Sequence, residues 1–357
     1  MNLLITADYV GELHHGGGVV TANEANALRR LDNLQVIHKP DLNPSKYSLP
    51  NEPFIIDYIA DGLVGNILEQ AHVTLAHFYA GTFSKTIRRL RTSGTIVTYT
   101  AAAHDRKLSI EEFESINGNY PYNHIKDDFL WSMYVEGYKQ ANLVICPSNL
   151  SMRIMRDYGC KNVVVIPHGV DIPKETKPLP KRFAVGYLGQ VGPDKGLIYL
   201  LRAWRLLKYK DAILYLAGRD TTSLMPIIRR ECTGNVHIIG FVQNICDLYN
   251  RCSVYVQPSV SEGFGIEVLE AMAHRRPVIV SEGAGSCDLV ENGFNGFRVP
   301  IRNPQEIASY IDWYRSNQDK MIDMANNAYA TALQYTWSNI RERYIKEWQN
   351  VLSSIRQ

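Results

Sequence analysis

Two glutamates eight positions apart, Glu262 and Glu270, offer the clearest chemistry in this 357-residue sequence. They follow an apolar run at 254–256, and a loop with Gly263 and Gly265 leads from that run into a helical pattern. A buried strand, a glycine-containing loop and a helix start leave backbone N–H groups free, and the helix dipole there favours negative charge. The stretch therefore predicts a phosphate site.

The two carboxylates would repel a phosphate, so we expect them to accept hydrogen bonds from hydroxyl groups on either side of it. A phosphate flanked by hydroxyls describes a nucleotide sugar. The alternative for this stretch alone is that the glycines only shape a turn and that both acids face solvent.

Three other places could serve the same ligand. Gly17 and Gly18, in a glycine triplet before the helix expected at 21–30, would let the backbone approach a ligand closely. His104 follows the strand expected at 95–100 and could donate a hydrogen bond to a sugar hydroxyl. Lys195 lies on a second glycine-rich loop and could reach a diphosphate. The alternatives are a flexible loop, a packed histidine and a surface lysine.

Composition limits the class of protein. Lys and Arg number 38 against 36 Asp and Glu, so there is no basic surplus for a dedicated nucleic-acid binder. Six cysteines are scattered without metal-type spacing, which is typical of reduced thiols in a cytoplasmic protein. No apolar run approaches the length of about 18 residues that spans a membrane, and no signal-peptide pattern is present. We therefore expect a cytoplasmic protein.

Strand-like runs alternate with helical patterns, which predicts two α/β domains with parallel sheets. We expect a first domain at 1–172, a proline-rich linker at 173–182, a second domain at 183–337 and a C-terminal helix at 338–357 that returns to the first domain. The expected strands are 3–6, 54–56, 73–76, 95–100, 143–146, 163–166, 184–188, 213–217, 236–239, 254–257, 277–280 and 296–299. Ligands of such sheets bind at the carboxyl ends of the strands, so the cleft between the domains is the expected site.

Two motifs are missing from the sequence. No D-x-D is present, so no metal clamp for a diphosphate is expected. No G-x-G-x-x-G follows a strand with an acid about 20 residues later, which argues against a dinucleotide oxidoreductase.

Taken in order, these motifs resemble the retaining glycosyltransferases of family 4, which have the GT-B fold of two Rossmann-like domains facing across a cleft. The resemblance runs through 165–171, 189–196 and 235–242, and it ends in Glu262 to Ala273, which is similar to the family's E-x7-E element. It implies metal-independent, hexosyltransferase-type transfer of a sugar from a nucleoside diphosphate sugar to a hydroxyl of a glycan, a lipid-linked acceptor or a small molecule.

The resemblance also implies a role for each residue. Glu270 would bind the ribose, and Lys195 would neutralise the diphosphate. Glu262 would hold the donor sugar, and His104 would contact the sugar that is transferred. The remaining donor-binding positions implied in this way are Gly17, Gly18, Val242, Phe264, Gly265 and Ile266.

Gln190 departs from the family pattern, which usually has an arginine five residues before the lysine. Losing a guanidinium removes charge-assisted hydrogen bonds to the leaving group, each worth about 1.5–3 kcal/mol. Either Arg219 or another cation substitutes, or the diphosphate is less stabilised. A non-hydrolysing sugar-nucleotide epimerase and a non-catalytic nucleotide-sugar binder are the alternative functions.

Peripheral membrane contact through the basic helix with Lys85, Arg88, Arg89 and Arg91 is a further expectation, with a solvated helix face as its alternative.

Overall fold

The computed structural model describes residues 1–6, 10, 16–48, 53–79, 81–101, 103–115, 128–220 and 224–354. These residues form two compact units, each discontinuous in sequence. The first unit consists of the described residues within Met1–Ala103, Tyr122–His168 and Trp337–Gln357. The second consists of those within His104–Pro121 and Gly169–Thr336.

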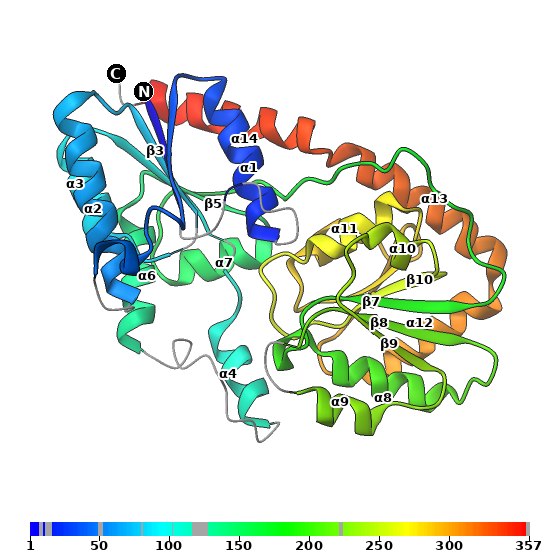
Figure 1. The fold of residues 1–357 in the computed structure, drawn as a ribbon. Helices are drawn as coiled ribbons and strands as arrows, with labels where there is room; N and C mark the ends of the chain where they lie inside the picture. Colours follow the sequence, from blue (N-terminus) through cyan, green and yellow to red (C-terminus); the bar gives the residue numbers. More distant parts are fainter. Residues whose placement is uncertain are drawn as a thin grey trace. The chain divides into compact units, whose positions relative to one another are not determined.

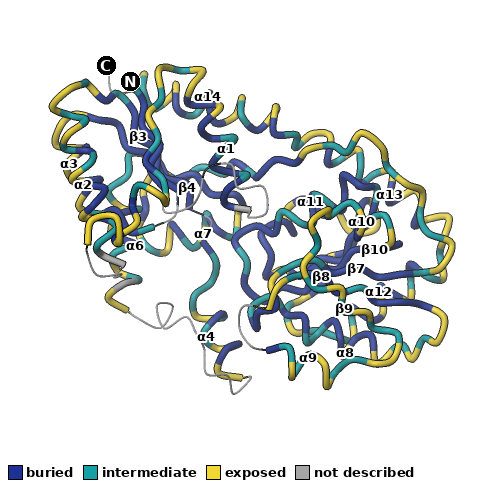
Figure 2. The backbone as a smooth tube through the Cα atoms, viewed as in Figure 1, coloured by how far each residue is buried: buried dark blue, intermediate teal, exposed yellow. Residues whose placement is uncertain are grey.

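The described part of the first unit contains a six-stranded parallel sheet in the order β2-β1-β3-β4-β5-β6 (Figure 1). Its strands are β1 (Asn2–Thr6), β2 (Leu34–Ile37), β3 (Leu75–Tyr79), β4 (Ile96–Thr100), β5 (Leu143–Cys146) and β6 (Val163–Val165). Strands β1, β3, β4 and β5 are buried along their whole length, whereas the edge strand β2 is partly exposed (Figure 2). The continuous apolar strands therefore form the core of this sheet.

Helices cover the first sheet. They are α1 (Gly16–Arg29), η1 (Pro44–Tyr47), α2 (Pro53–Gln70), α3 (Ser84–Thr92), α6 (Asp128–Gln140), α7 (Asn149–Asp157) and α14 (Trp337–Ser354). The C-terminal helix α14 packs along α1 (Figure 1). Its buried Trp348 donates a hydrogen bond to Thr98 in β4 at 3.1 Å, so the end of the chain contributes to the core of the first unit.

The described part of the second unit contains another six-stranded parallel sheet, in the order β12-β11-β10-β7-β8-β9. Its strands are β7 (Ala184–Leu188), β8 (Ile213–Ala217), β9 (Val236–Gly240), β10 (Val254–Gln257), β11 (Val278–Ser281) and β12 (Gly296–Val299). The order reverses between the neighbours β7 and β10. In doubly wound sheets, the loops after two such strands are where ligands bind.

The helical segments of the second unit are α4 (Arg106–Ser115), η2 (Pro193–Lys195), α8 (Leu197–Leu207), α9 (Met225–Glu231), α10 (Ile245–Tyr249), α11 (Ile266–Ala273), η3 (Gly285–Leu289), α12 (Pro304–Ser316) and α13 (Gln318–Gln334). Helix α4 follows β4 of the first unit in sequence, yet it belongs to the second unit and contacts η2. The segment that begins at His104 is therefore part of the second unit.

Two local predictions for the first unit are wrong. The run 54–56 is not a strand but lies within α2, because three apolar residues alone do not distinguish a strand from a buried helix. The glycine triplet does not precede α1 as a loop; the helix begins at Gly16 itself. Glycine is tolerated there because the first N–H groups of a helix have no partner within the helix.

Candidate functional site

The loop after β7 lies very close to the backbone of two other segments. Only glycine fits at Gly218, which follows β8 and faces this loop, and at Gly196, which lies in the loop itself. A Cβ atom on Gly218 would lie 1.7 Å from the carbonyl oxygen of Gly189, and one on Gly196 would lie 2.0 Å from that of Pro258. Both glycines also have positive φ, at 142° and 66°. These contacts fix the loop against the end of β8 and against the loop after β10.

Three donors from different elements orient the carboxylate of Glu262, which lies in the loop after β10. Its Oε2 accepts hydrogen bonds from Ser259 Oγ at 2.9 Å and from Gln257 Nε2 at 3.0 Å, and its Oε1 forms an ion pair with Lys195. Gln257 is the last residue of β10. The structure therefore joins Glu262 and Lys195 directly, although the sequence assigns them to different parts of a ligand.

The ion pair is largely removed from water, because 20% of the Lys195 side chain and 11% of the Glu262 side chain are exposed. Burial alone would lower the pKa of Lys195, but the negative charges around it, first that of Glu262 and then that of Asp194, outweigh that effect and raise it. Lysine is therefore fully protonated here. The backbone carbonyl of Asp194 also accepts from Val260 N at 2.7 Å, which ties the two loops together.

A third loop, after β11, is hydrogen-bonded to the loop that carries Glu262. Glu262 N donates to Gly283 O at 2.9 Å, and Ser286 N donates to Phe264 O at 2.7 Å. Phe264 is buried, and Gly265 has φ of 87° immediately before α11 begins at Ile266. The turn therefore presents the first backbone N–H groups of α11 beside the Lys195–Glu262 pair, as expected for an anion site.

Helix α11 carries two more acids: Glu267 lies near this pair, and Glu270 lies near Glu267. Burial and the charge of Glu262 raise the pKa of Glu267 to about 8. Burial raises the pKa of Glu270 to about 7, although Tyr249 opposes this by donating a hydrogen bond to Glu270 Oε2 at 3.0 Å. The buried residues of the helix are Val268, Leu269, Ala271, Met272 and Ala273. The packing of this apolar face fixes where the acids stand.

His104 also lies at this site. Burial and the positive charge of Lys195 lower its pKa, while the negative charges of Asp194, Glu262 and Asp105 act in the opposite direction. The net direction is downward, so the imidazole is neutral near pH 7. The structure thus brings His104, Lys195, Glu262 and Glu270 into one unit.

The remaining predicted residues of the second unit flank the same loops. Gln190 is exposed, and its backbone carbonyl accepts from Tyr187 Oη at 3.0 Å. Val242 packs against the small apolar cluster of Ala217, Leu248 and Cys252.

Arg219, the candidate substitute cation, joins the Gln190 loop through its backbone. Its carbonyl accepts from Val191 N at 2.9 Å. Its guanidinium carbon lies 3.9 Å from the centroid of the Phe241 ring. The cation is therefore held beside the loop after β7.

Gly17 and Gly18 belong to the first unit, where they form the buried first turn of α1 after the strand β1. Their carbonyls accept hydrogen bonds from Thr21 Oγ1 at 3.0 and 3.1 Å. The first sheet reverses its order between β1 and β3, so this turn occupies the corresponding switch position of the first unit.

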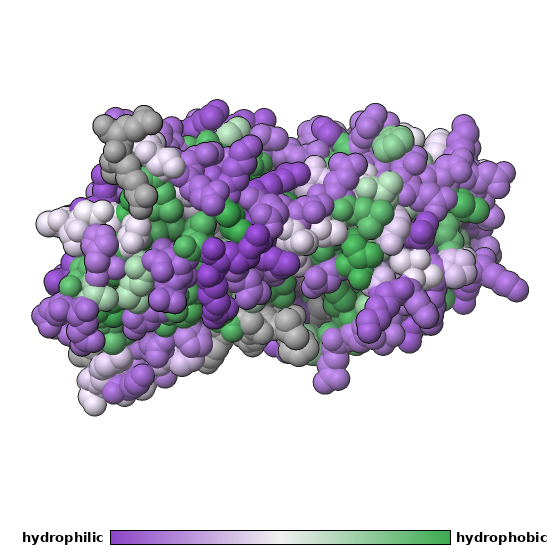
Figure 3. Space-filling view, turned by 90° about the horizontal axis from the view of Figure 1, so that it is seen from above, coloured by the Kyte–Doolittle hydropathy of each residue, from purple (hydrophilic) through white to green (hydrophobic). Residues whose placement is uncertain are grey.

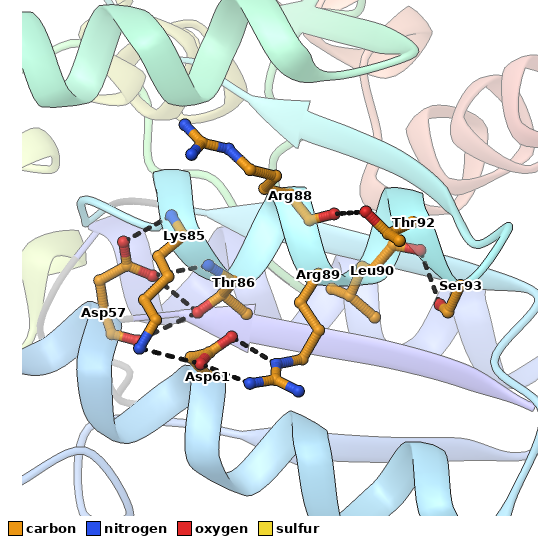
Figure 4. Close-up of polar contacts among 9 residues, drawn as sticks. All are labelled: Asp57, Asp61, Lys85, Thr86, Arg88, Arg89, Leu90, Thr92 and Ser93. Atoms are coloured by element: carbon orange, nitrogen blue, oxygen red, sulfur yellow. Dashed lines mark hydrogen bonds and ion pairs between the residues drawn. The ribbon is translucent and has the colours of Figure 1, made fainter.

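The basic helix α3 has acidic partners on α2 (Figure 4). Arg89 forms two hydrogen bonds with the buried Asp61, at 2.6 and 2.9 Å, and Lys85 Nζ lies 3.1 Å from the same carboxylate. These partners hold the pKa of Asp61 below its ordinary value. In Figure 4 the side chain of Arg88 points away from this group. Part of the positive charge expected on this face is therefore already compensated.

Within the described ranges, no three His, Cys, Asp or Glu side chains are grouped so that they could hold a metal ion. None of the helices described here is long and apolar enough to cross a membrane. The face of the molecule seen in Figure 3 is mostly hydrophilic, with small hydrophobic patches.

Two Rossmann-like units in one chain, each with a parallel sheet that reverses its strand order at a switch point, define the GT-B class of fold. Residues 171–331 match the family model of glycosyl transferases group 1, and residues 15–174 match that of glycosyltransferase family 4. The chain belongs to the family 4 glycosyltransferases.

Curated relatives of this family match parts of the chain. A Campylobacter jejuni N,N'-diacetylbacillosaminyl-diphospho-undecaprenol alpha-1,3-N-acetylgalactosaminyltransferase is 26% identical over 242 residues, which cover 63% of this chain and 64% of the relative. The Staphylococcus aureus capsular polysaccharide biosynthesis glycosyltransferase CapM is 30% identical over 145 residues, which cover 39% of this chain and 38% of the relative. The chain thus spans less than two thirds of the length of each.

Solved structures match almost the whole chain. A sucrose-phosphate synthase from Thermosynechococcus elongatus superposes with a TM-score of 0.80 at 17% identity and covers 99% of both chains. Anabaena HepE, in complex with UDP and glucose, superposes with a TM-score of 0.75 at 19% identity and covers 98% of this chain and 100% of its own. At these identities the likeness shows the fold.

Sequence reasoning missed the residues that hold the predicted ones in place. Gln257, Ser259 and Tyr249 fix the orientation of the two motif glutamates, and Glu267 is a third, partly buried acid at the site. The role of Gln257 could have been predicted only from its place as a polar residue at the end of a buried strand. The role of Tyr249 could not be predicted from the sequence, because Tyr249 lies 21 residues from Glu270.

The raised pKa of Glu267 predicts a stability that depends on pH. An unfolded glutamate ionises near pH 4.5 and the folded one near 8, so between these values the unfolded state releases a proton that the folded state keeps. The free energy of unfolding should therefore fall as pH rises, by up to about 1.4 kcal/mol per pH unit. Glu267→Gln should remove this fall, so its stability relative to the native chain should increase steadily from pH 5 to pH 8.

Urea unfolding of both proteins across this range measures the difference. Glu282→Gln, at an exposed position in the same unit, is the matched control. A difference for Glu267→Gln that does not vary with pH would contradict the raised pKa.

Proposed function

We propose that this protein transfers a hexose from a nucleoside diphosphate sugar to an acceptor hydroxyl, with retention of the anomeric configuration and without an essential metal. The observation that carries the proposal is the buried Lys195–Glu262 pair beside the start of α11, with Glu270 one turn further along. The cation and the helix N–H groups suit a diphosphate, and the acids on either side suit hydroxyls.

Lys195 must change partners when the donor binds. Before binding, its ammonium group forms an ion pair with Glu262, and the negative charge of Asp194 also acts on it. A diphosphate carries more negative charge and would draw the ammonium toward its oxygens, which stabilises the charge that develops as the sugar leaves. Glu262 then has a carboxylate oxygen available for a hydroxyl of the donor sugar, while Ser259 and Gln257 keep it oriented.

The bonds around Glu262 argue against its use as a nucleophile. Three donors, Lys195, Ser259 and Gln257, stabilise its carboxylate, and each of them would have to weaken before it attacked a sugar carbon. Same-face transfer, in which the departing diphosphate accepts the proton of the acceptor hydroxyl, uses only groups that the site offers. The neutral His104 would hydrogen-bond to the sugar that is transferred.

The relatives suggest which substrates to test first. HepE has been crystallised in complex with UDP-glucose. The Campylobacter relative is named for an acceptor in which a sugar is linked to diphospho-undecaprenol. We therefore propose a UDP-sugar as donor and a glycan or a lipid-linked sugar as acceptor, with action in the cytoplasm.

Gln190 favours a second candidate, a non-catalytic nucleotide-sugar binder. Its neutral amide stands where the family has a guanidinium, so the diphosphate would bind without full stabilisation as a leaving group. Tight donor binding without transfer or hydrolysis would favour the binder, and conversion of the donor without an acceptor would favour an epimerase.

Replacing Lys195 or Glu270 by alanine should lower the rate of transfer and leave the fold intact. Each variant loses a charge-assisted contact worth about 1.5–3 kcal/mol, which corresponds to a loss of roughly tenfold to a hundredfold. The rate of UDP release from a panel of UDP-sugars, measured with EDTA present because no metal is required, tests this. Lys210→Ala, at an exposed lysine of the same unit, is the control. Near-normal rates in both variants would refute the assignment.

Restoring the family arginine should strengthen the diphosphate site. Gln190 is exposed, so Gln190→Arg introduces a guanidinium without disturbing the core. We expect tighter binding of UDP, by roughly tenfold, because a charge-assisted hydrogen bond is gained. Calorimetric titration with UDP measures the affinity, and Gln190→Met, which adds no charge, is the matched control. Equal affinity in the two variants would mean that this position does not face the diphosphate.

Peripheral contact with an anionic membrane is a further proposal, and it depends most on Arg88. Lys85 and Arg89 share Asp61, and Arg91 donates to the backbone of Gln140 at 2.6 Å. If the contact exists, Arg88→Gln should reduce flotation with anionic liposomes more than Arg91→Gln does. Absence of flotation for the native chain would refute the contact.

A further inference from the structure

Helix α4 is attached at its beginning to the loop that carries Glu262. Ser261 Oγ donates a hydrogen bond to the backbone carbonyl of Asp105 at 2.8 Å. The Asp105 carboxylate accepts from Leu108 N at 3.0 Å, which caps the first turn of the helix. The residue directly after His104 is thus bonded to the residue directly before Glu262.

The far end of α4 is attached to other elements of the same unit through a buried carboxylate. Glu112 is 1% exposed and forms an ion pair with Arg302, which follows β12. Its two oxygens also accept from the hydroxyl of Tyr199 in α8, at 3.2 and 3.1 Å. Arg302 lies 3.3 Å from the neighbouring Glu111 as well. A carboxylate this deeply buried is stable only while such partners remain.

The position of His104 depends on these two attachments. Helix α4 contacts η2, which carries Asp194 and Lys195, and the charges of both residues act on the His104 ring. Because α4 is a continuous helix from Arg106, a tilt at Glu112 would move its first turn and the histidine before it. Glu112 itself is eight residues from His104 and bonds to none of the acids or cations of the donor site.

We propose that Glu112 is a positioning residue, which fixes α4 through Arg302 and Tyr199 and thereby holds His104 beside Lys195 and Glu262. The proposal rests on the proposed transfer reaction for its catalytic consequence. Its structural consequence, the placement of the His104 ring, does not depend on that reaction.

The experiment follows the His104 ring directly. The protein is labelled at histidine carbon, the His104 resonance is assigned by its loss in His104→Gln, and its titration is followed by NMR. In Glu112→Ala the ring should leave its partly buried position, so its pKa should rise toward the ordinary value of 6.5. Transfer should fall by roughly tenfold or more through kcat, because misplaced groups lose rate steeply, while UDP affinity stays unchanged.

Two further variants keep the test decisive. Tyr199→Phe removes one hydrogen bond to Glu112 without removing bulk, and it should give a smaller change in the same direction if Glu112→Ala does not fold. Arg205 lies on the same helix as Tyr199 and forms an ion pair with Glu231. Arg205→Gln breaks this ion pair, and it should leave both the His104 titration and the transfer rate unchanged.

An unchanged His104 titration in folded Glu112→Ala and Tyr199→Phe would overturn the inference. A loss of stability in these variants with native kcat would overturn it too, because Glu112 would then be only structural. If the native chain transfers no sugar from any donor, the proposed function fails, while the NMR titration still decides the role of Glu112.

Discussion

The partly buried ion pair between Lys195 and Glu262 is the interaction on which the candidate donor site depends. Each partner comes from a loop that follows one of the two strands at the switch point, so the pair exists only if β7 and β10 are neighbours. The fold therefore holds cation and carboxylate together at the carboxyl ends of β7 and β10.

Burial around this pair lowers the pKa of His104 and raises that of Glu267. Both groups are therefore uncharged at neutral pH. Neither adds a positive charge that would compete with Lys195 or a negative charge that would repel an anion. The pKa of Glu270 is about 7, so this carboxyl group is partly ionised at neutral pH. A hydroxyl that donates a hydrogen bond to Glu270 would favour its ionised form, so the binding of such a hydroxyl would release a proton.

Sequence could predict the parts of the site that are local in the chain. The strand, glycine turn and helix around Glu262 and Glu270 follow from apolar periodicity and glycine positions within one short segment. Parallel sheets follow from the alternation of elements. The pairing of Glu112 with Arg302 could not be predicted, because the two residues are 190 positions apart and neither lies in a motif. The same holds for the assignment of α4 to the second unit, which depends on tertiary contacts alone.

The helix that carries the acids also supports the predicted linker. After α11 ends, Arg275 donates to Thr176 Oγ1 at 3.0 Å, and the fully buried Arg276 donates to Lys177 O at 2.7 Å. Burial lowers the pKa of Arg276 to about 10, because backbone carbonyls compensate its charge less well than a carboxylate would. A guanidinium is kept buried here at a cost in free energy, and its bonds join the linker to the same rigid helix that positions Glu267 and Glu270. The linker residues Thr176 and Lys177 are therefore held against the end of α11, within the second unit.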